Sequence, residues 1–282
     1  MKKGLILEGG GLRGLFTAGA VDALMENNVE FEYIIGVSAG GGNALNYKSH
    51  QIGRTKNVMM PENRKLNAFG KYAFKRSGRL IDLDMIYETF PYKHFPFDFE
   101  SYYSSDKECE YVAVNCLSGE AEYLSENSDN KRLGLIGKAT CCVPLVCKPV
   151  VIDGVPYLDG SIVDSLPVKH AFEKGCDKQF VIFTREEKTM PTDYRKMKGI
   201  LKVVFRKYPN LLDAFWKRFD RYFEQLDYLK KMEKEGKVYV LRPEIESISK
   251  SKPDYEADER FYNHGYEIMK RKMPELQEFL RA

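Results

Sequence analysis

The sequence lacks most of the features that mark specialised classes of protein. Its 282 residues contain no run of 18 apolar residues, so we expect no transmembrane helix. The first apolar stretch is interrupted at Glu8, which is too early for a signal peptide. Lysine and arginine total 44 against 41 acidic residues, and a net charge of only +3 argues against a dedicated nucleic-acid-binding protein.

The six cysteines form no C-x-x-C pair and no zinc-binding spacing. Two of them, Cys141 and Cys142, are adjacent, which is typical of reduced, buried thiols rather than of a disulfide framework. Hydrophobic residues make up 43% and charged residues 30%, as in an ordinary globular protein. A chain of this length supports one large α/β domain, alone or with an appendage. We therefore expect a cytoplasmic protein with a sizeable core.

The first fifty residues alternate between strand-like and helix-like patterns. Residues 5–7 predict a buried strand, and apolar residues then recur at helical spacing over residues 15–25. Residues 31–35 predict a second strand, which is followed by another short helix. Two strand–turn–helix units in succession indicate a βαβ arrangement with a parallel sheet.

The rest of the chain predicts hairpins first and helices later. The hairpins pair residues 111–117 with 120–124 and residues 150–152 with 155–157. Further predicted elements are a helix around residues 133–139, strands over 180–183 and 238–241, and a long amphipathic helix over 211–229. We expect a catalytic domain over residues 1–185 and a mostly helical extension over residues 186–282 that packs on it.

A glycine-rich loop of the form G-x-G-x-x-G follows the first predicted strand. It consists of Gly9, Gly10, Gly11, Leu12, Arg13 and Gly14. A Walker loop is excluded because Leu15 occupies the position of the required lysine. A dinucleotide site needs an acidic residue at the end of the second strand, which the chain lacks. The remaining ligand-binding use is an oxyanion hole built from amides without obstructing side chains. A tight turn without a ligand is the alternative.

The second predicted strand leads into Gly36-Val37-Ser38-Ala39-Gly40, which matches G-x-S-x-G. A nucleophile elbow requires this pattern between a strand and a helix, and both are predicted here. Gly36 and Gly40 remove side chains that would collide in so sharp a turn. The pattern therefore predicts that Ser38 is presented outward as a nucleophile.

Two bases for this serine stay open on the residues alone. Asp159-Gly160 follows the second hairpin, where the chain turns back towards the core, although a plain Asp-Gly turn is an alternative interpretation. The order Ser38, Asp159, His264 would also fit the triad of an α/β-hydrolase. A histidine in such a helical context is more often structural, so the triad is the minor alternative.

Taken in order, these motifs resemble the patatin-like phospholipase family. The likeness covers about residues 4–185 and includes the stretch from Ala139 to Pro144, ahead of Leu158-Asp159-Gly160. The resemblance implies a three-layer α/β/α fold with a mostly parallel sheet. It also implies that Ser38 and Asp159 form a dyad without histidine or any cofactor or metal, with an oxyanion hole around Gly10, Gly11 and Leu12. Ser161 departs from the family, which usually has Gly or Ala after Asp-Gly.

The resemblance implies a serine acyl hydrolase for phospholipids, lysophospholipids or other fatty-acyl esters. The alternatives are a thioesterase or acyltransferase with the same dyad, or a non-catalytic regulator that binds acyl groups or nucleotides. The aromatic stretch over residues 87–103 predicts either core packing or an acyl pocket. The basic helix over residues 211–232 either packs on the body or contacts an anionic membrane transiently, and its interleaved acidic residues favour packing.

Overall fold

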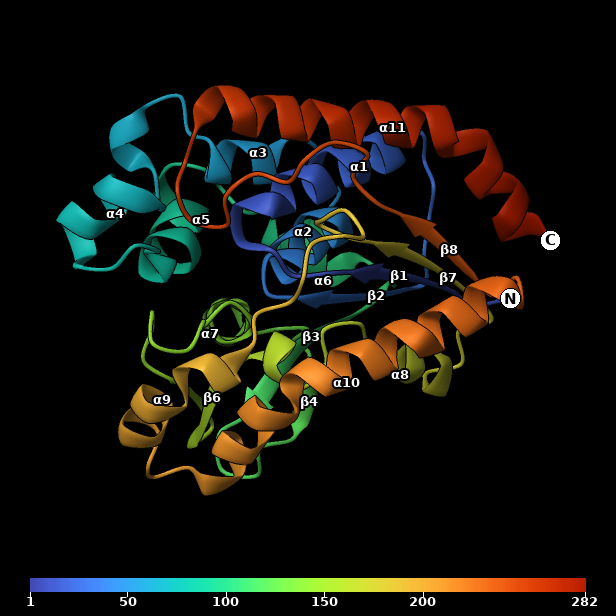
Figure 1. Ribbon diagram of the computed structural model, residues 1–282. Coiled ribbons are helices and arrows are strands. Elements are labelled where there is room, and N and C mark those ends of the chain that lie inside the picture. The colour runs from blue at the N-terminus through green and yellow to red at the C-terminus, as the bar shows by residue number, and fades with distance from the viewer.

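An eight-stranded mixed sheet runs through the middle of the protein, and helices cover both of its faces (Figure 1). The computed structural model describes residues 1–282. The strands are β1 (Lys3–Leu7), β2 (Tyr33–Val37), β3 (Glu108–Asn115), β4 (Ala121–Leu124), β5 (Val150–Ile152), β6 (Val155–Asp159), β7 (Lys178–Ile182) and β8 (Val238–Leu241). The sheet has the order β5-β6-β3-β2-β1-β7-β8, and β4 pairs with β3. These findings confirm the predicted α/β class.

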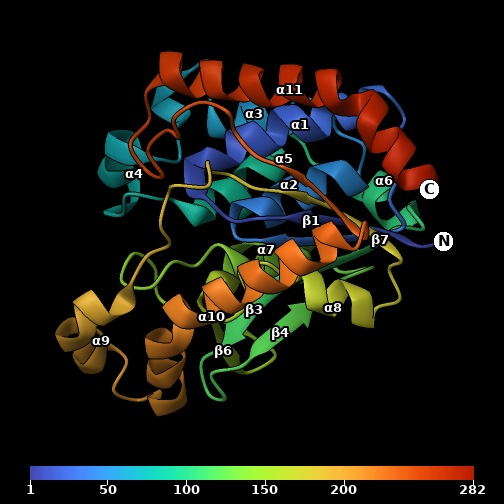
Figure 2. The ribbon, with the colours of Figure 1, turned by 45° about the vertical axis from the view of Figure 1, so that its right-hand side comes forward.

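Helices form a layer on each side of this sheet, as Figure 2 also shows. On one side lie α1 (Gly14–Glu26), α2 (Ala39–Lys48), α3 (Arg54–Met59) and α11 (Tyr255–Arg281). On the other side lie α8 (Val168–Glu173) and α10 (Pro209–Lys234). Shorter helices complete the chain: α4 (Gly70–Ser77), α5 (Phe90–Lys93), α6 (Phe99–Ser104), α7 (Asn130–Thr140) and α9 (Lys198–Val204).

Strands β1, β2, β3, β7 and β8 are parallel to one another, and β8 forms one edge of the sheet. Their buried, continuous apolar runs are typical of strands that are covered on both faces. Every strand predicted from the sequence is present, but β2 begins at Tyr33 rather than at residue 31. Phe31 is buried ahead of the strand, so hydrophobicity alone did not mark where pairing begins. All six cysteines are free, as predicted.

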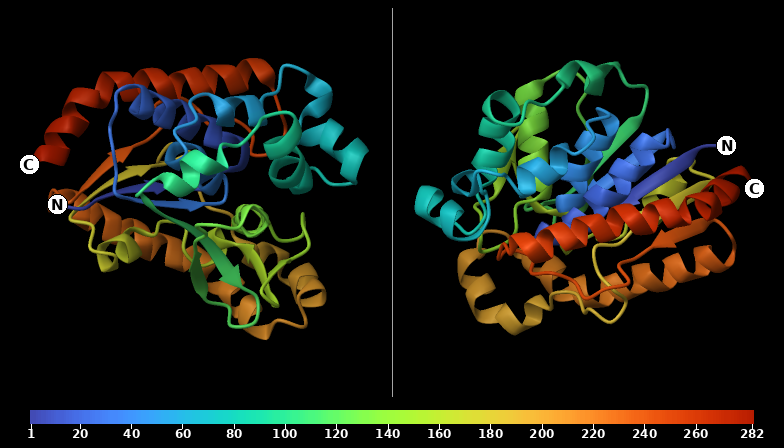
Figure 3. Two further views of the ribbon diagram at one scale, coloured as in Figure 1. Left: turned by 180° about the vertical axis from the view of Figure 1, so that it is seen from behind. Right: turned by 90° about the horizontal axis from the view of Figure 1, so that it is seen from above.

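The C-terminal residues are part of the same layered body. Strand β8 extends the sheet beside β7, and α11 lies along α1 (Figure 3). The two helices approach closely at Gly19 and Gly265, where an added side chain would collide with the carbonyl oxygens of Tyr262 and Phe16 respectively. The sheet therefore runs across the expected boundary at residue 185, and the division into two domains stays a prediction.

Helix α10 packs on the sheet through its apolar face. Leu211, Phe215, Tyr222 and Leu229 on this face are all buried. This confirms the favoured alternative for the apolar face, namely packing on the body. No helix of the protein has the length and apolar character needed to cross a bilayer.

Two strands meet end to end along one edge of β3. Val37, the last residue of β2, pairs with Val112, and Asp159, the last residue of β6, pairs with the next residue, Ala113. Strand β4 occupies the other edge at both positions, so β2 and β6 share the remaining one. Because β2 runs parallel and β6 antiparallel to β3, their carboxyl ends face each other. This junction brings residues 38 and 159 together.

Candidate active site

Ser38 lies in a strained turn between β2 and α2. Its backbone has φ 55° and ψ −124°, a conformation that residues other than glycine rarely adopt. Gly36 and Gly40 make the turn sterically feasible: a side chain on Gly40 would collide with the carbonyl oxygen of Leu7, and one on Gly36 with the backbone of Gly40. This is the geometry that the G-x-S-x-G pattern predicted.

Thr140 fixes the strained turn to the sheet. The Ser38 amide donates a hydrogen bond of 2.9 Å to Thr140 Oγ1. The same hydroxyl donates a bond of 2.7 Å to the carbonyl oxygen of Val112 on β3. Gly160 packs against that same carbonyl, where a side chain would not fit. The segments that carry Ser38 and Asp159 are therefore both positioned by one residue of β3.

Asp159 ends β6 and is only 2% exposed. Its Oδ1 accepts a hydrogen bond of 2.8 Å from the Ser161 amide. Burial raises the pKa of Asp159, whereas the Ser161 amide, the Ser38 hydroxyl, the Ser161 side chain and the Arg218 charge oppose this effect. The Ser38 hydroxyl thus lies within interaction distance of the carboxyl. The two side chains do not form a hydrogen bond in this structure, and catalytic hydrogen bonds often tighten only when substrate binds.

The glycine loop adjoins Ser38 directly. A Cβ atom on Gly9 would lie only 2.8 Å from the Ser38 Cβ atom. The amides of Gly9, Gly10 and Gly11 have no acceptor within the protein. Gly11 has φ 58°, which turns the backbone at the start of the short helical turn that precedes α1. Free amide donors therefore lie beside the candidate nucleophile.

The other half of the loop is already hydrogen-bonded. The Leu12 amide donates to the carbonyl oxygen of Lys250 (2.9 Å), and the Arg13 amide donates to that of Gly10 (3.2 Å). The Gly14 amide is bonded to the carbonyl oxygen of Gly11. The expectation that Leu12 supplies an oxyanion donor is therefore wrong, because a chain segment far away in sequence occupies its amide.

Two cavities meet at Ser38. An apolar cavity of about 300 Å³ lies on one side, and a polar cavity of about 350 Å³ on the other. They share Gly11, Ser38, Val143, Val146 and Lys250. Both volumes fall within the range of small-molecule sites.

The aromatic stretch over residues 87–103 contributes both to a cavity and to core packing, the two alternatives expected for it. Tyr87, Phe97 and Phe99 line the apolar cavity. Phe90 and Tyr102 are fully buried in the core instead. The pattern of aromatic residues cannot separate these groups, because the fold of the short helices and turns over residues 85–104 decides which rings face the cavity.

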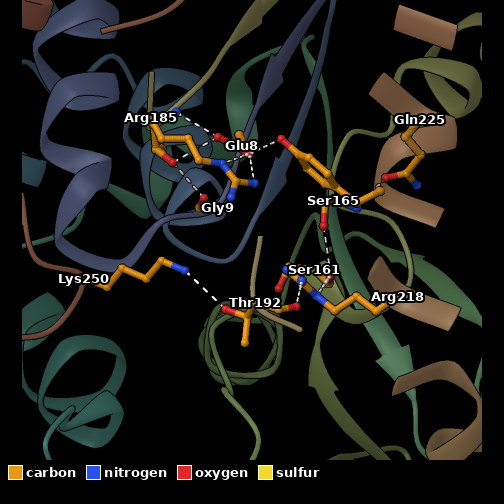
Figure 4. A network of polar contacts seen from close by, with 11 residues as sticks. Glu8, Gly9, Ser161, Ser165, Arg185, Thr192, Arg218, Gln225 and Lys250 are labelled. Atoms are coloured by element: carbon orange, nitrogen blue, oxygen red, sulfur yellow. Dashed lines mark hydrogen bonds and ion pairs between the residues drawn. The ribbon is translucent and has the colours of Figure 1, made fainter. Parts of the chain in front are cut away.

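The polar cavity contains a charged network that the sequence did not indicate (Figure 4). Glu8 is 2% exposed and pairs with Arg185, whose Nη2 lies 2.7 Å from Glu8 Oε1. The other carboxylate oxygen of Glu8 accepts a bond of 2.9 Å from the Thr184 amide. Arg218 donates bonds to the carbonyl oxygens of Ser161 and Thr192.

Thr140, Arg185, Arg218 and Lys250 were not predicted as site residues. A signal existed for Arg218, because a charged residue lies in the buried stripe of α10 at helical spacing from Phe215 and Tyr222. Lys250 comes from an irregular segment, and nothing in the local sequence marks it.

His264 does not reach Ser38. Its Nε2 accepts a hydrogen bond of 2.9 Å from the Glu244 amide, and its ring packs on Phe16 with centroids 5.5 Å apart. It lines neither cavity at Ser38. The alternative of a triad with His264 is therefore wrong in this structure.

Two families of known proteins match parts of this chain. The family model described as patatin-like phospholipase matches residues 5–172. A second family, described as a domain of unknown function (DUF6363), matches residues 208–281.

Two individual proteins are similar to this chain. The uncharacterized protein YjjU of Escherichia coli strain K12 is 32% identical over 184 residues, which are 64% of this chain and 51% of YjjU. The chain thus spans about half the length of this relative. The crystal structure of VipD from Legionella pneumophila has a TM-score of 0.53 at 13% identity, covering 96% of this chain and 66% of that chain. At this identity the likeness supports the fold alone.

The family match covers more than half of the chain and includes the motifs that carry Ser38 and Asp159. It confirms the resemblance seen in the sequence, and the fold agrees with it. The protein therefore belongs to the patatin-like phospholipase family of lipid acyl hydrolases.

Proposed function

We propose that the protein is a serine acyl hydrolase that cleaves fatty-acyl esters of lipids with Ser38 as nucleophile and Asp159 as general base. The observation that carries this proposal is the head-to-head meeting of β2 and β6. It holds a strained serine against a buried carboxyl, beside free loop amides and at the mouth of an apolar cavity.

In the proposed reaction, Asp159 accepts the proton of Ser38 as the serine oxygen attacks the ester carbonyl. The amides of Gly10 and Gly11 are the donors for the developing oxyanion. Each such donor contributes roughly 10²–10³ in rate. Asp159 then returns the proton to the departing alcohol. In the second half, water replaces the alcohol, and the same base activates it to release the fatty acid.

The electrostatics of Asp159 suit this role. An ordinary aspartate, with a pKa of about 3.9, is a poor base near neutrality. Burial raises the pKa of Asp159, which brings its basicity closer to that needed for proton transfer. The Ser161 amide and the Arg218 charge oppose this effect and favour the ionised carboxylate that a general base requires.

The apolar cavity is the proposed acyl site. Its wall includes Leu45, Val58, Met59, Ile86 and Phe97, none of which offers a charge or hydrogen bond to a ligand. Removing an acyl chain from water contributes about 0.8 kcal/mol for each buried CH₂ group. This apolar wall favours fatty esters over small polar esters.

Transient contact with an anionic membrane surface belongs to the same proposal, but the surface differs from the one expected. Helix α9 exposes Ile200 (54%), Val203 (70%) and Val204 (52%) next to Lys198 and Lys202. This combination of exposed apolar and basic side chains suits an interfacial helix. Liposome flotation tests it: Val203→Asp should reduce binding to anionic vesicles, and equal binding would contradict it. A cytoplasmic location stays a prediction.

A fluorophosphonate probe tests the reaction class. We expect labelling at Ser38 that is lost in Ser38→Ala, and loss of esterase activity in Asp159→Asn. His264→Gln is the matched control and should keep its activity. Absence of labelling would favour a non-catalytic binding protein. Transfer of the acyl group to an added alcohol, or preference for thioesters, would instead favour an acyltransferase or thioesterase.

A further inference from the structure

The polar cavity on the far side of Ser38 is strongly cationic. Four basic side chains line it: Arg13, Arg185, Arg218 and Lys250. Only two carboxyl groups, Glu8 and Asp159, line the same space. We call this space the cationic chamber.

Glu8 neutralises only one of these cations, because it is paired with Arg185 at 2.7 Å. The other three cations make no ion pair with any carboxylate of the protein: they are Arg13, Arg218 and Lys250. Arg218 is buried and Arg13 is half-buried. Because burying unpaired charge is unfavourable, this arrangement calls for an anion.

Arg218 is only 7% exposed, yet its protein partners are two neutral carbonyl groups. These bonds use two of its five N–H donors. The remaining donors of this guanidinium have no acceptor in the protein. A planar guanidinium with free donors suits two oxygens of a phosphate or carboxylate.

Arg13 is a second cation with an unused hydrogen-bond donor. Its Nε donates a bond of 2.9 Å to the Ile248 carbonyl oxygen, whereas its Nη1 is buried without any partner. Lys250 is exposed at the edge of the chamber, and its only side-chain hydrogen bond is a long one of 3.5 Å to Thr192 Oγ1 (Figure 4). Neither cation is held by a structural ion pair.

The chamber lies on the leaving-group side of Ser38. Because the apolar cavity is the proposed acyl site, an ester carbonyl at Ser38 directs its alcohol into the polar cavity. We propose that the cationic chamber binds a phosphomonoester on the leaving alcohol, so that the preferred substrate is a fatty-acyl ester of glycerol phosphate. This inference rests on the proposed function.

Charge and size select this class over other lipids. A phosphomonoester carries about −1.5 to −2 charges at pH 7, which matches three unpaired cations better than a phosphodiester does. A choline headgroup would add a positive charge to a site that already holds an excess. A volume of about 350 Å³ accommodates glycerol phosphate but not a whole coenzyme A.

The test compares esters that share one acyl chain and differ in the alcohol: acylglycerol phosphate, acylglycerophosphocholine, monoacylglycerol and acyl-coenzyme A. We expect kcat/KM for the phosphomonoester to exceed that for monoacylglycerol by about tenfold or more, mainly through KM. Lys250→Met should reduce this ratio about tenfold, and Arg13→Met should also lower it. Lys252→Met is the matched control, because Lys252 is exposed and lines neither cavity.

A ratio near one, or a ratio unchanged in both variants, overturns the proposal while turnover of monoacylglycerol still supports the dyad. Preference for acyl-coenzyme A overturns the glycerol phosphate assignment. If no substrate is turned over, the proposed function fails, and calorimetry on Ser38→Ala decides the chamber separately. There, glycerol 3-phosphate should bind more tightly than inorganic phosphate, and more weakly after Lys250→Met. Equal binding of both anions, or none, overturns the inference.

Discussion

Replacing Thr140 by valine tests how the strained serine is held in place. Valine has nearly the same shape but no hydroxyl, so the Ser38 amide loses its acceptor and the Val112 carbonyl loses a donor. Thr140→Ser is the matched control, because serine keeps the hydroxyl and removes only the methyl group.

The expected effects follow from these two bonds. An unsatisfied buried amide destabilises a protein by about 1–3 kcal/mol. The backbone of Ser38 already stores strain of about 1–3 kcal/mol, and without its anchor the turn can relax. We therefore expect Thr140→Val to lower the free energy of unfolding by about 2–3 kcal/mol, whereas Thr140→Ser loses about 1 kcal/mol for one methyl group. A domain with 5–15 kcal/mol of stability stays folded in both cases.

Activity should separate the two variants more sharply than stability. A nucleophile that has moved out of line loses about ten- to hundredfold in kcat, which corresponds to about 1.4–3 kcal/mol. The assay is hydrolysis of a fatty-acyl reporter ester, with Tm measured on the same samples. If Thr140→Val kept the kcat of Thr140→Ser, the idea that this hydroxyl positions Ser38 would be refuted.

Three further predictions concern charge and packing. Burial raises the pKa of Asp159 in the folded protein above its ordinary value of 3.8. The stability of the fold therefore falls as the pH rises from 3.8 through the folded-state pKa. Asp159→Asn should raise Tm at pH 7–8, but not at pH 4, while activity is lost. The pKa of Lys250 is lowered to about 8 by partial removal from water and, secondarily, by the charges of Arg13, Arg185 and Arg218, whereas Glu8 opposes this shift. Preference for a phosphomonoester should therefore decline above about pH 8. A preference that does not depend on pH would contradict this. Gly265→Ala should lower Tm because the new methyl group meets the Phe16 carbonyl, whereas Gly199→Ala, with nothing within 4 Å, should not.

Local patterns predicted the parts of the site that are contiguous in sequence. Gly36 and Gly40 frame the serine turn, and the glycines at positions 9–11 supply free amides, because both features depend on backbone conformation within a few residues. Asp159 was also predicted, from its place after a hairpin and from the family resemblance. The sequence could not show why it meets Ser38, since that depends on β2 and β6 sharing one edge of β3.

Long-range contacts decided what the sequence patterns missed. Leu12 was expected to offer its amide to an oxyanion, but Lys250, 238 positions later, already accepts from it. The amphipathic face of α10 was compatible with a membrane or with the body, and only the packed structure distinguishes these surfaces. The spacing of hydrophobic residues shows that a helix has an apolar face, but it does not show which partner covers that face.

The proposed chemistry and the proposed selectivity come from different parts of the chain. Ser38, Asp159 and the glycine loop fall within residues 5–172, which the patatin-like phospholipase model matches. Arg185, Arg218 and Lys250 lie outside that range, and two of them fall within residues 208–281. A relative can therefore keep the dyad and lose the cationic chamber. On this reasoning, preference for a phosphomonoester should follow the basic residues of the later segment and not the G-x-S-x-G motif, which only provides the reaction.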